Sequence, residues 1–299
     1  MFHVKHRVLH CTIFICSCHL YFSFSVKYSI INSNLHSVTG GFLVNIVAIA
    51  NQKGGVGKTT TAINLSACVA ACNRRVLIID LDPQGNTTTG LGVDKNTDRP
   101  AIYDVLINRV PLEEAVVQTT MPGLKIAPAN ISLAGAEVEL VSEIAREYFL
   151  KRALDAVKDQ YDDVFIDCPP ALGLLTLNAL AAADKLLVPI QCEFFALEGL
   201  TDLMSTVALV RKHLNPSLIV EGVVMTMFDK QTNLSKQVVA EVQRFFPNRV
   251  YQSYIPRNVR LAEAPSFGLP VILYDKNCAG SQAYMALAEE YVNGVKENE

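Results

Sequence analysis

The chain has 299 residues, of which 50% are hydrophobic and 18% are charged, enough to bury a sizeable core in one large α/β domain. Its formal net charge is −3, but residues 1–43 carry three cations and no acidic side chain, which leaves residues 44–299 at −6. This balance excludes a protein that coats nucleic acid through overall positive charge, since any such contact must come from a local basic patch.

The eight cysteines include no Cys-x-x-Cys pair, and residues 44–299 hold no histidine at ligand spacing. We therefore expect reduced, mostly buried thiols and a cytoplasmic protein. Cys16 and Cys18, with the histidines near them, match no standard zinc pattern.

Residues 1–43 differ in composition from the rest of the chain. The stretch 11–26 is apolar and aromatic after a basic start, as in a signal peptide, but serine and histidine interrupt it and no convincing cleavage site follows. It is also shorter than the ~20 apolar residues that span a membrane. We expect residues 1–43 to be a non-native or disordered extension and residues 44–299 to form the functional domain.

The first predicted elements of that domain are a strand, a glycine-rich loop and a helix. The apolar run 44–50 predicts the strand, and the loop 51–60 reads Asn-Gln-Lys-Gly-Gly-Val-Gly-Lys-Thr-Thr. Glycines let successive backbone N–H groups converge on phosphate oxygens, and the periodic run 62–69 predicts a helix whose positive N-terminus faces the anion. This order predicts a phosphate-binding loop.

Individual residues of the loop have expected tasks. Lys58 reaches the β- and γ-phosphates, and the hydroxyl of Thr59 ligates Mg²⁺. The usual first glycine of such a loop falls on Gln52, so the pattern is Lys-Gly-Gly-x-Gly-Lys-Thr; an ordinary P-loop enzyme and a simple glycine turn are the alternatives. The residues predicted to bind nucleotide are Lys53, Gly54, Gly55, Val56, Gly57, Lys58, Thr59 and Thr60.

Two later apolar runs, 75–82 and 162–167, are predicted as central strands of a parallel sheet, and both end in carboxylates. Open α/β sheets bind ligands at the carboxyl ends of their strands, so we assign Asp80 and Asp82 to the site, with a strand-end cap as the alternative. Asp167 is expected on the Mg²⁺ side and holds the ion through water.

The remaining elements alternate between strands and helices. Strands are predicted at 123–128, 184–190 and 219–227, with a short strand before 255; helices are predicted at 101–107, 112–117, 132–145, 147–158, 197–214, 233–246 and 281–294. The segments 87–92 and 169–173 are interpreted as nucleotide-sensing loops, the first equally well as an ordinary surface loop. The alternation predicts a doubly wound, mostly parallel sheet with flanking helices.

Four motifs follow one another along residues 53–266. They are Lys-Gly-Gly-Val-Gly-Lys-Thr-Thr, Asp-Leu-Asp-Pro-Gln-Gly-Asn, Ile-Asp-Cys-Pro-Pro and Ile-Pro-Arg-Asn-Val-Arg-Leu-Ala-Glu-Ala-Pro-Ser. In this order they resemble the chromosome-partitioning ATPases of the ParA/Soj family, P-loop NTPases with a deviant Walker A in the ParA/MinD group. The last motif, and the lack of a C-terminal amphipathic helix rich in Lys and Phe, distinguish the chain from MinD.

The resemblance implies ATP and Mg²⁺ as cofactors, slow partner-stimulated hydrolysis to ADP, and a homodimer when ATP is bound. Lys53 would cross to the partner's phosphates, much as an arginine finger does, and act with Lys58 and Asp82 in catalysis. Asp82 would orient the attacking water, while Pro256 and Asn258 line the adenine pocket. The residues implied at the metal are Thr59, Asp80 and Asp167.

The resemblance also implies partners. Arg260 matches one DNA-contacting position of the family, whereas a second position is Gln231 here, so its neighbour Lys230 is expected to substitute. Such binding to phosphates is non-specific and salt-sensitive. A ParB-type centromere-binding protein, a location on the nucleoid and no stable membrane association are further expectations.

Two other classes stay open. One is a membrane-cycling positioning ATPase like MinD. The other is a metabolic enzyme of the same loop family with an iron–sulfur cluster, for which Cys168 is the one candidate ligand, giving two thiols per dimer instead of four.

The resemblance suggests an origin for residues 1–43. The peptide Met-Phe-His-Val-Lys-His at the start can be encoded by DNA containing the palindrome TGTTTCACGTGAAACA, which resembles the parS site that ParB binds. We favour the hypothesis that the segment is upstream DNA translated in frame, with genuine translation beginning at Leu43 or Val44.

Overall fold

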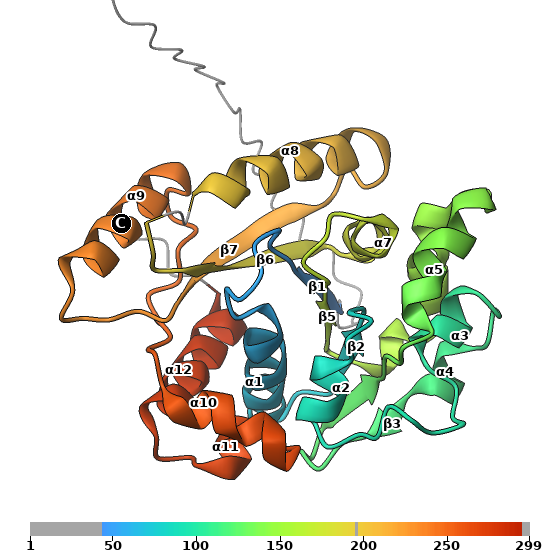
Figure 1. The fold of residues 1–299 in the computed structure, drawn as a ribbon, viewed down its shortest axis with the longest axis horizontal. Coiled ribbons are helices and arrows are strands. Elements are labelled where there is room, and N and C mark those ends of the chain that lie inside the picture. Colours follow the sequence, from blue (N-terminus) through green and yellow to red (C-terminus); the bar gives the residue numbers. More distant parts are fainter. Residues whose placement is uncertain (1–43, 195–196, 295–299) are drawn as a thin grey trace, which may run out of the picture. The chain divides into compact units, whose positions relative to one another are not determined.

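The computed structural model describes residues 44–194 and 197–294. The expectations for residues 1–43, and the domain boundary predicted there, lie outside this part. The described residues form a sheet with helices on both faces (Figure 1). Among them, no helix combines the length and the apolar character that crossing a membrane requires.

The sheet has seven strands in the order β3-β4-β2-β5-β1-β6-β7 within the described part of the chain. Every neighbouring pair is parallel except β3 and β4, which are antiparallel. The predicted doubly wound, mostly parallel architecture is therefore confirmed. The strands are β1 Asn45–Ile49, β2 Val76–Asp80, β3 Val117–Gln118, β4 Leu124–Ala127, β5 Asp163–Asp167, β6 Lys185–Gln191 and β7 Ile219–Thr226.

The helices α1 to α8 lie in the connections between strands, and α9 to α12 follow the last strand. The α-helices are α1 Lys58–Ala71, α2 Asn86–Gly90, α3 Ile102–Leu106, α4 Leu112–Ala115, α5 Leu133–Glu139, α6 Phe149–Asp155, α7 Leu174–Ala182, α8 Glu198–His213, α9 Asn233–Phe245, α10 Val259–Glu263, α11 Val271–Tyr274 and α12 Ala279–Asn293. The 3₁₀ helices are η1 Leu140–Ser142, η2 Arg146–Tyr148, η3 Lys158–Gln160 and η4 Ala264–Phe267.

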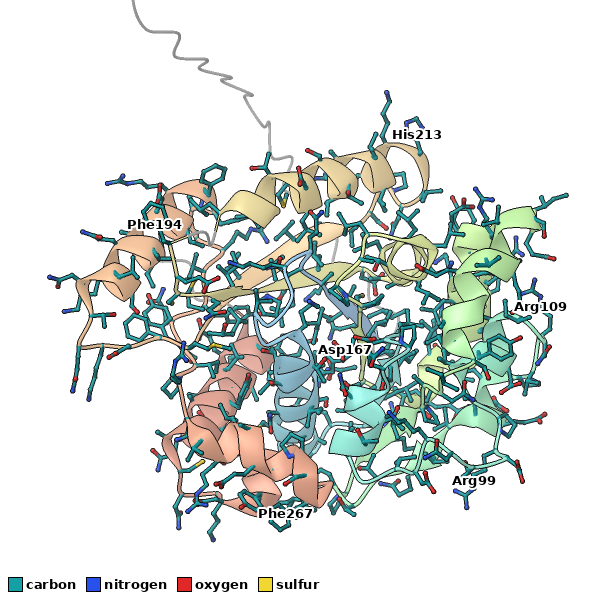
Figure 2. All side chains as sticks on the ribbon, in the orientation of Figure 1. Arg99, Arg109, Asp167, Phe194, His213 and Phe267 are labelled. Atoms are coloured by element: carbon teal, nitrogen blue, oxygen red, sulfur yellow. The ribbon has the colours of Figure 1, made fainter. Side chains whose placement is uncertain are left out.

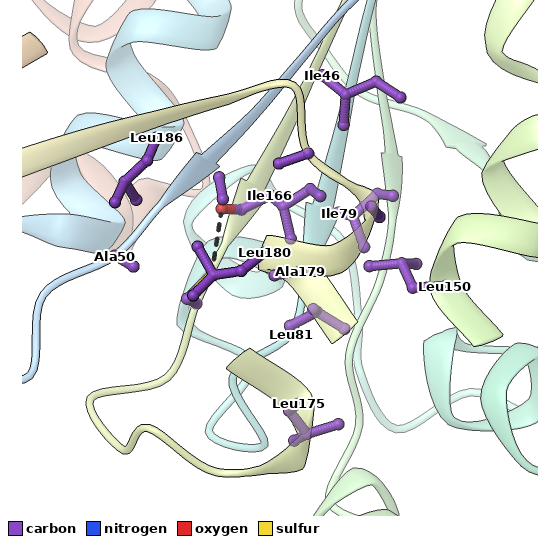
Figure 3. Close-up of a cluster of buried hydrophobic side chains, with 14 of the residues drawn as sticks. Ile46, Ala50, Ile79, Leu81, Leu150, Ile166, Leu175, Ala179, Leu180 and Leu186 are labelled. Atoms are coloured by element: carbon purple, nitrogen blue, oxygen red, sulfur yellow. Dashed lines mark hydrogen bonds between the residues drawn. The ribbon is translucent and has the colours of Figure 1, made fainter. Parts of the chain in front are cut away.

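Alternate side chains of the strands enter two separate cores. On β1, Ile46 and Ala48 face one core and Val47 and Ile49 face the other. The first core packs against α3 to α9 and the second against α1 and α10 to α12, which lie on opposite sides of the sheet in Figure 1. Figure 3 shows the first core, where strand side chains meet those of α7. Each buried leucine or isoleucine contributes about 1.5–3 kcal/mol relative to exposure.

Several local predictions were wrong. The segment 87–92, predicted as a loop, contains the helix α2, and the predicted helix 132–145 ends at Glu139 and continues as η1. In place of the short strand predicted before Ile255, the described residues form an isolated bridge between Val223 and Val250, and a second one, between Phe228 and Pro256, follows Ile255. The helix α7 and the two-residue strand β3 were not predicted.

Candidate nucleotide and magnesium site

The glycine-rich loop joins β1 to α1 at the carboxyl edge of the sheet, and neighbouring strands hold both its ends. Asn51 is buried, donates from Nδ2 to the carbonyl of Pro189 at 2.8 Å, and accepts from the N–H of Lys53 at 3.0 Å. At the other end, the hydroxyl of Thr226 donates to the carbonyl of Val56 at 2.8 Å. The loop is thus fixed by β6 and β7 before any ligand arrives.

Glycine is required at two positions of this loop for its backbone. Gly55 and Gly57 have φ of 75° and 87°, in the left-handed region that side chains with a Cβ avoid. Gly54 differs, because a Cβ built there meets no atom within 4 Å. A side chain at Gly54 is therefore compatible with the single chain.

The two lysines of the loop have different surroundings. Lys58 is only 7% exposed and donates from Nζ to the carbonyl of Lys53 at 3.0 Å. Burial lowers the pKa of Lys58, and the opposing charges of Asp167 and Asp82 only partly counter this. The Nζ of Lys53 forms an ion pair with Glu193 of the same chain, with the two side chains 34% and 36% exposed. The expected contact of Lys53 with a partner's phosphates stays a prediction.

Asp80 and Asp167 lie side by side, because they are register partners at the ends of β2 and β5. Both are fully buried. Burial raises the pKa of Asp80, and burial together with the charge of Asp80 raises the pKa of Asp167. Each of the two buried carboxylates disfavours the negative charge of the other, so a cation bound between them would stabilise both charged forms.

Threonines of α2, which the sequence reasoning missed, hold both carboxylates. The Oγ1 of Thr87 donates to Oδ2 of Asp167 at 2.7 Å. The N–H and Oγ1 of Thr88 donate to Oδ2 of Asp80 at 2.8 and 2.7 Å. Figure 2 shows Asp167 between α1 and α2.

The residues at this position fit a hydrated Mg²⁺ ion. Oδ1 of Asp167 is buried and has no hydrogen-bond partner among the described residues. The hydroxyl of Thr59 is near enough to lower the pKa of Asp167. The described part of the chain contains no cluster of three or more His, Cys, Asp or Glu side chains that could enclose a metal. Mg²⁺ usually keeps several waters and binds through one or two carboxylates together with phosphate.

Two adjoining cavities accompany the loop. The cavity of about 270 Å³ is lined by the glycine loop, Asp82, Asn86 and Pro170, and the cavity of about 220 Å³ by Pro256, Asn258 and Tyr284. They share Gly57, Thr60 and Met227, so the two cavities meet at the N-terminus of α1. Met227, a non-glycine residue with φ of 49°, was not predicted at this junction.

Arg260 and Lys230, the predicted DNA contacts, belong to segments joined by the bridge between Phe228 and Pro256. Arg260 is 47% exposed in its side chain and pairs with Glu263 at 2.7 Å and Asp275 at 3.5 Å. Lys230 is exposed in the turn before α9. The two acids offset the charge of Arg260.

Cys168 follows Asp167 and is buried. Burial raises the pKa of its thiol, so without a bound metal the sulfur is protonated.

A family model described as an AAA domain matches residues 44–220. The chain is 55% identical over 245 residues to the sporulation initiation inhibitor protein Soj of Bacillus subtilis strain 168, covering 82% of this chain and 97% of the relative. It is 54% identical over 258 residues to the chromosome partitioning protein ParA of Caulobacter vibrioides, covering 86% of this chain and 97% of the relative.

Solved structures share this fold. A cobyrinic acid a,c-diamide synthase from Mycobacterium smegmatis, with bound ADP and magnesium, matches with a TM-score of 0.74 and 38% identity over 84% of this chain and 95% of that one. The cell division ATPase MinD of Pyrococcus furiosus matches with a TM-score of 0.69 and 25% identity over 84% of this chain and 99% of that one.

Proposed function

The chain belongs to the ParA/Soj family of P-loop ATPases, and from that premise we propose that it is an ATP-driven, DNA-binding switch that segregates chromosome or plasmid DNA. ATP and Mg²⁺ bind at the glycine loop, the ATP-bound chain dimerises on non-specific DNA, and a ParB-type partner stimulates hydrolysis to ADP. The protein then acts in the cytoplasm, on the nucleoid. One observation carries the proposal: a glycine loop with a buried lysine stands beside a pair of buried carboxylates at one edge of the sheet.

The chemistry assigned to each residue follows from its surroundings. Lys58 is buried with its ammonium on the loop, so a phosphate would replace the carbonyl of Lys53 as its partner and favour its charged form. The bound Mg²⁺ would neutralise phosphate charge, held by Thr59, Asp80 and Asp167. Asp82 lines the phosphate cavity and is only partly buried, so it can accept a hydrogen bond from an attacking water there.

The nucleotide base would occupy the smaller cavity. Pro256 and the side chain of Tyr284 supply apolar walls, and Asn258 supplies a polar edge. The Oδ1 of Asn258 already accepts from the N–H of Arg260 at 2.9 Å, which links the base pocket to the first turn of α10. A base bound against Asn258 would therefore lie beside Arg260, the proposed DNA-binding residue.

A pelleting assay distinguishes this function from its alternatives. Purified protein is spun with DNA or with anionic liposomes, each in the presence of ATP, ADP or no nucleotide. We expect ATP-dependent, salt-sensitive recovery with DNA and none with liposomes. Recovery with liposomes alone would favour a MinD-like membrane ATPase, and ATP hydrolysis without either binding would favour a metabolic enzyme.

A further inference from the structure

The helix α2 brings two buried threonines onto the carboxylates of the magnesium site. Thr87 and Thr88 are fully buried, whereas their neighbour Thr89 is exposed and donates from Oγ1 to the carbonyl of Gly85 at 3.1 Å. Three threonines in a row therefore have different partners. Only the first two contact acids.

Thr87 makes the two carboxylate oxygens of Asp167 unequal, because it donates a hydrogen bond to only one of them. Its hydroxyl donates to Oδ2 at 2.7 Å, while Oδ1 is left buried without a hydrogen-bond partner among the described residues. An unpartnered carboxylate oxygen in the interior is costly unless something else binds it. The bond from Thr87 thus fixes which oxygen of Asp167 remains for the cation and its water.

Thr88 anchors the helix that carries Thr87. Its Oγ1 donates to Oδ2 of Asp80 at 2.7 Å and accepts from the N–H of Ala129 at 2.9 Å, so it joins the end of β2 to the segment after β4. Close packing adds to this, because a Cβ on Gly90 would stand 2.5 Å from Cδ1 of Ile63 on α1. Little room remains for α2 to shift.

We propose that Thr87 is a positioning residue of the magnesium site: it holds Asp167 in the one orientation that presents Oδ1 to the ion. This inference rests on the proposed function, since it concerns the same Mg²⁺–nucleotide site. Thr87 acts on the ion only through its hydrogen bond to Asp167. Removing a group that hydrogen-bonds to a metal ligand typically weakens metal affinity roughly 10- to 100-fold.

The test is a Mg²⁺ titration of the full chain in the presence of ADP, with calorimetry as the readout. The affinity for ADP in excess chelator is measured in a separate experiment. Thr87→Val should raise the half-saturating Mg²⁺ concentration roughly 10- to 100-fold and leave the metal-free ADP affinity unchanged. Thr87→Ser, which keeps the hydroxyl, should behave as the wild type. Thr89→Val is the matched control and should also leave the titration unchanged.

The outcomes distinguish failure of the proposed function from failure of the role of Thr87. Wild-type protein without Mg²⁺-dependent nucleotide binding would contradict the proposed function itself. Wild-type binding together with an unaltered titration for Thr87→Val, or an equal loss for Thr87→Ser, would overturn the role of Thr87. If Thr87→Val does not fold, Thr87→Ala provides the same comparison, and lower thermal stability with unchanged Mg²⁺ dependence would mark a merely structural threonine.

Discussion

Replacing Lys58 with alanine should weaken nucleotide binding more than it weakens the fold. The lowered pKa of Lys58 means that burial disfavours its ammonium more than Asp167 and Asp82 favour it. Without nucleotide, the side chain of Lys58 donates to the carbonyl of Lys53. Losing the side chain should therefore change the free energy of unfolding of the free chain by only about 1 kcal/mol.

The nucleotide complex loses a charge-assisted hydrogen bond in a buried site. Such a bond contributes about 1.5–3 kcal/mol, which corresponds to an affinity for ATP lowered roughly 10- to 150-fold. Isothermal calorimetry with Mg²⁺–ATP measures this loss, thermal unfolding of the free chain measures the fold, and Lys58→Arg is the control that retains charge. Unchanged ATP affinity in a folded Lys58→Ala variant would refute the assignment of this loop as the phosphate site.

Three further substitutions test separate steps. Asp82→Ala should bind ATP and dimerise but hydrolyse roughly 10²- to 10⁴-fold more slowly in a phosphate-release assay, and a monomer with ATP would contradict this. Gly54→Val should abolish the ATP dimer in light scattering, because the family resemblance places Gly54 where the loops of two subunits meet. The thermal unfolding of the free chain should not change, since a Cβ there meets nothing within 4 Å. Arg260→Ala should weaken binding to every DNA sequence and lower by about one the slope of log affinity against log salt concentration. Arg99→Ala, at another exposed arginine, is the control and should change neither. A sequence-selective loss would argue against a phosphate contact.

The central strands and the glycine loop after β1 were predictable from local sequence. Strands buried on both faces are apolar almost without interruption, and β2 and β5 have that composition up to their terminal acids. Glycines followed by Lys58 and Thr59 identify a phosphate loop by themselves. Parallel strands end at the same edge, so the sequence placed Asp80 and Asp167 at one edge, but that β2 and β5 are neighbours is seen only in the structure.

The helices α7 and α2 were not predictable in the same way. Residues of α7 are apolar around nearly the whole helix, because the sheet covers one side and α6 and α8 cover others, so no amphipathic period marks it. α2 is rich in threonine, a weak helix former, and it is helical here because Thr87 and Thr88 satisfy buried carboxylates. Both cases depend on tertiary contacts that a local window does not contain.

The ion pair between Lys53 and Glu193 bears on how the proposed dimer would form. Both side chains are about one-third exposed, and such a pair contributes about 0–1 kcal/mol. A hydrogen bond from Lys53 to a phosphate, enclosed between two subunits, would contribute about 1.5–3 kcal/mol. For Lys53, exchanging Glu193 for a phosphate is therefore favourable only where ATP and a second subunit are both present. In the chain without them, Lys53 stays paired with Glu193. The same residue can in this way couple nucleotide binding to dimerisation without any large rearrangement of the loop, whose ends β6 and β7 already fix.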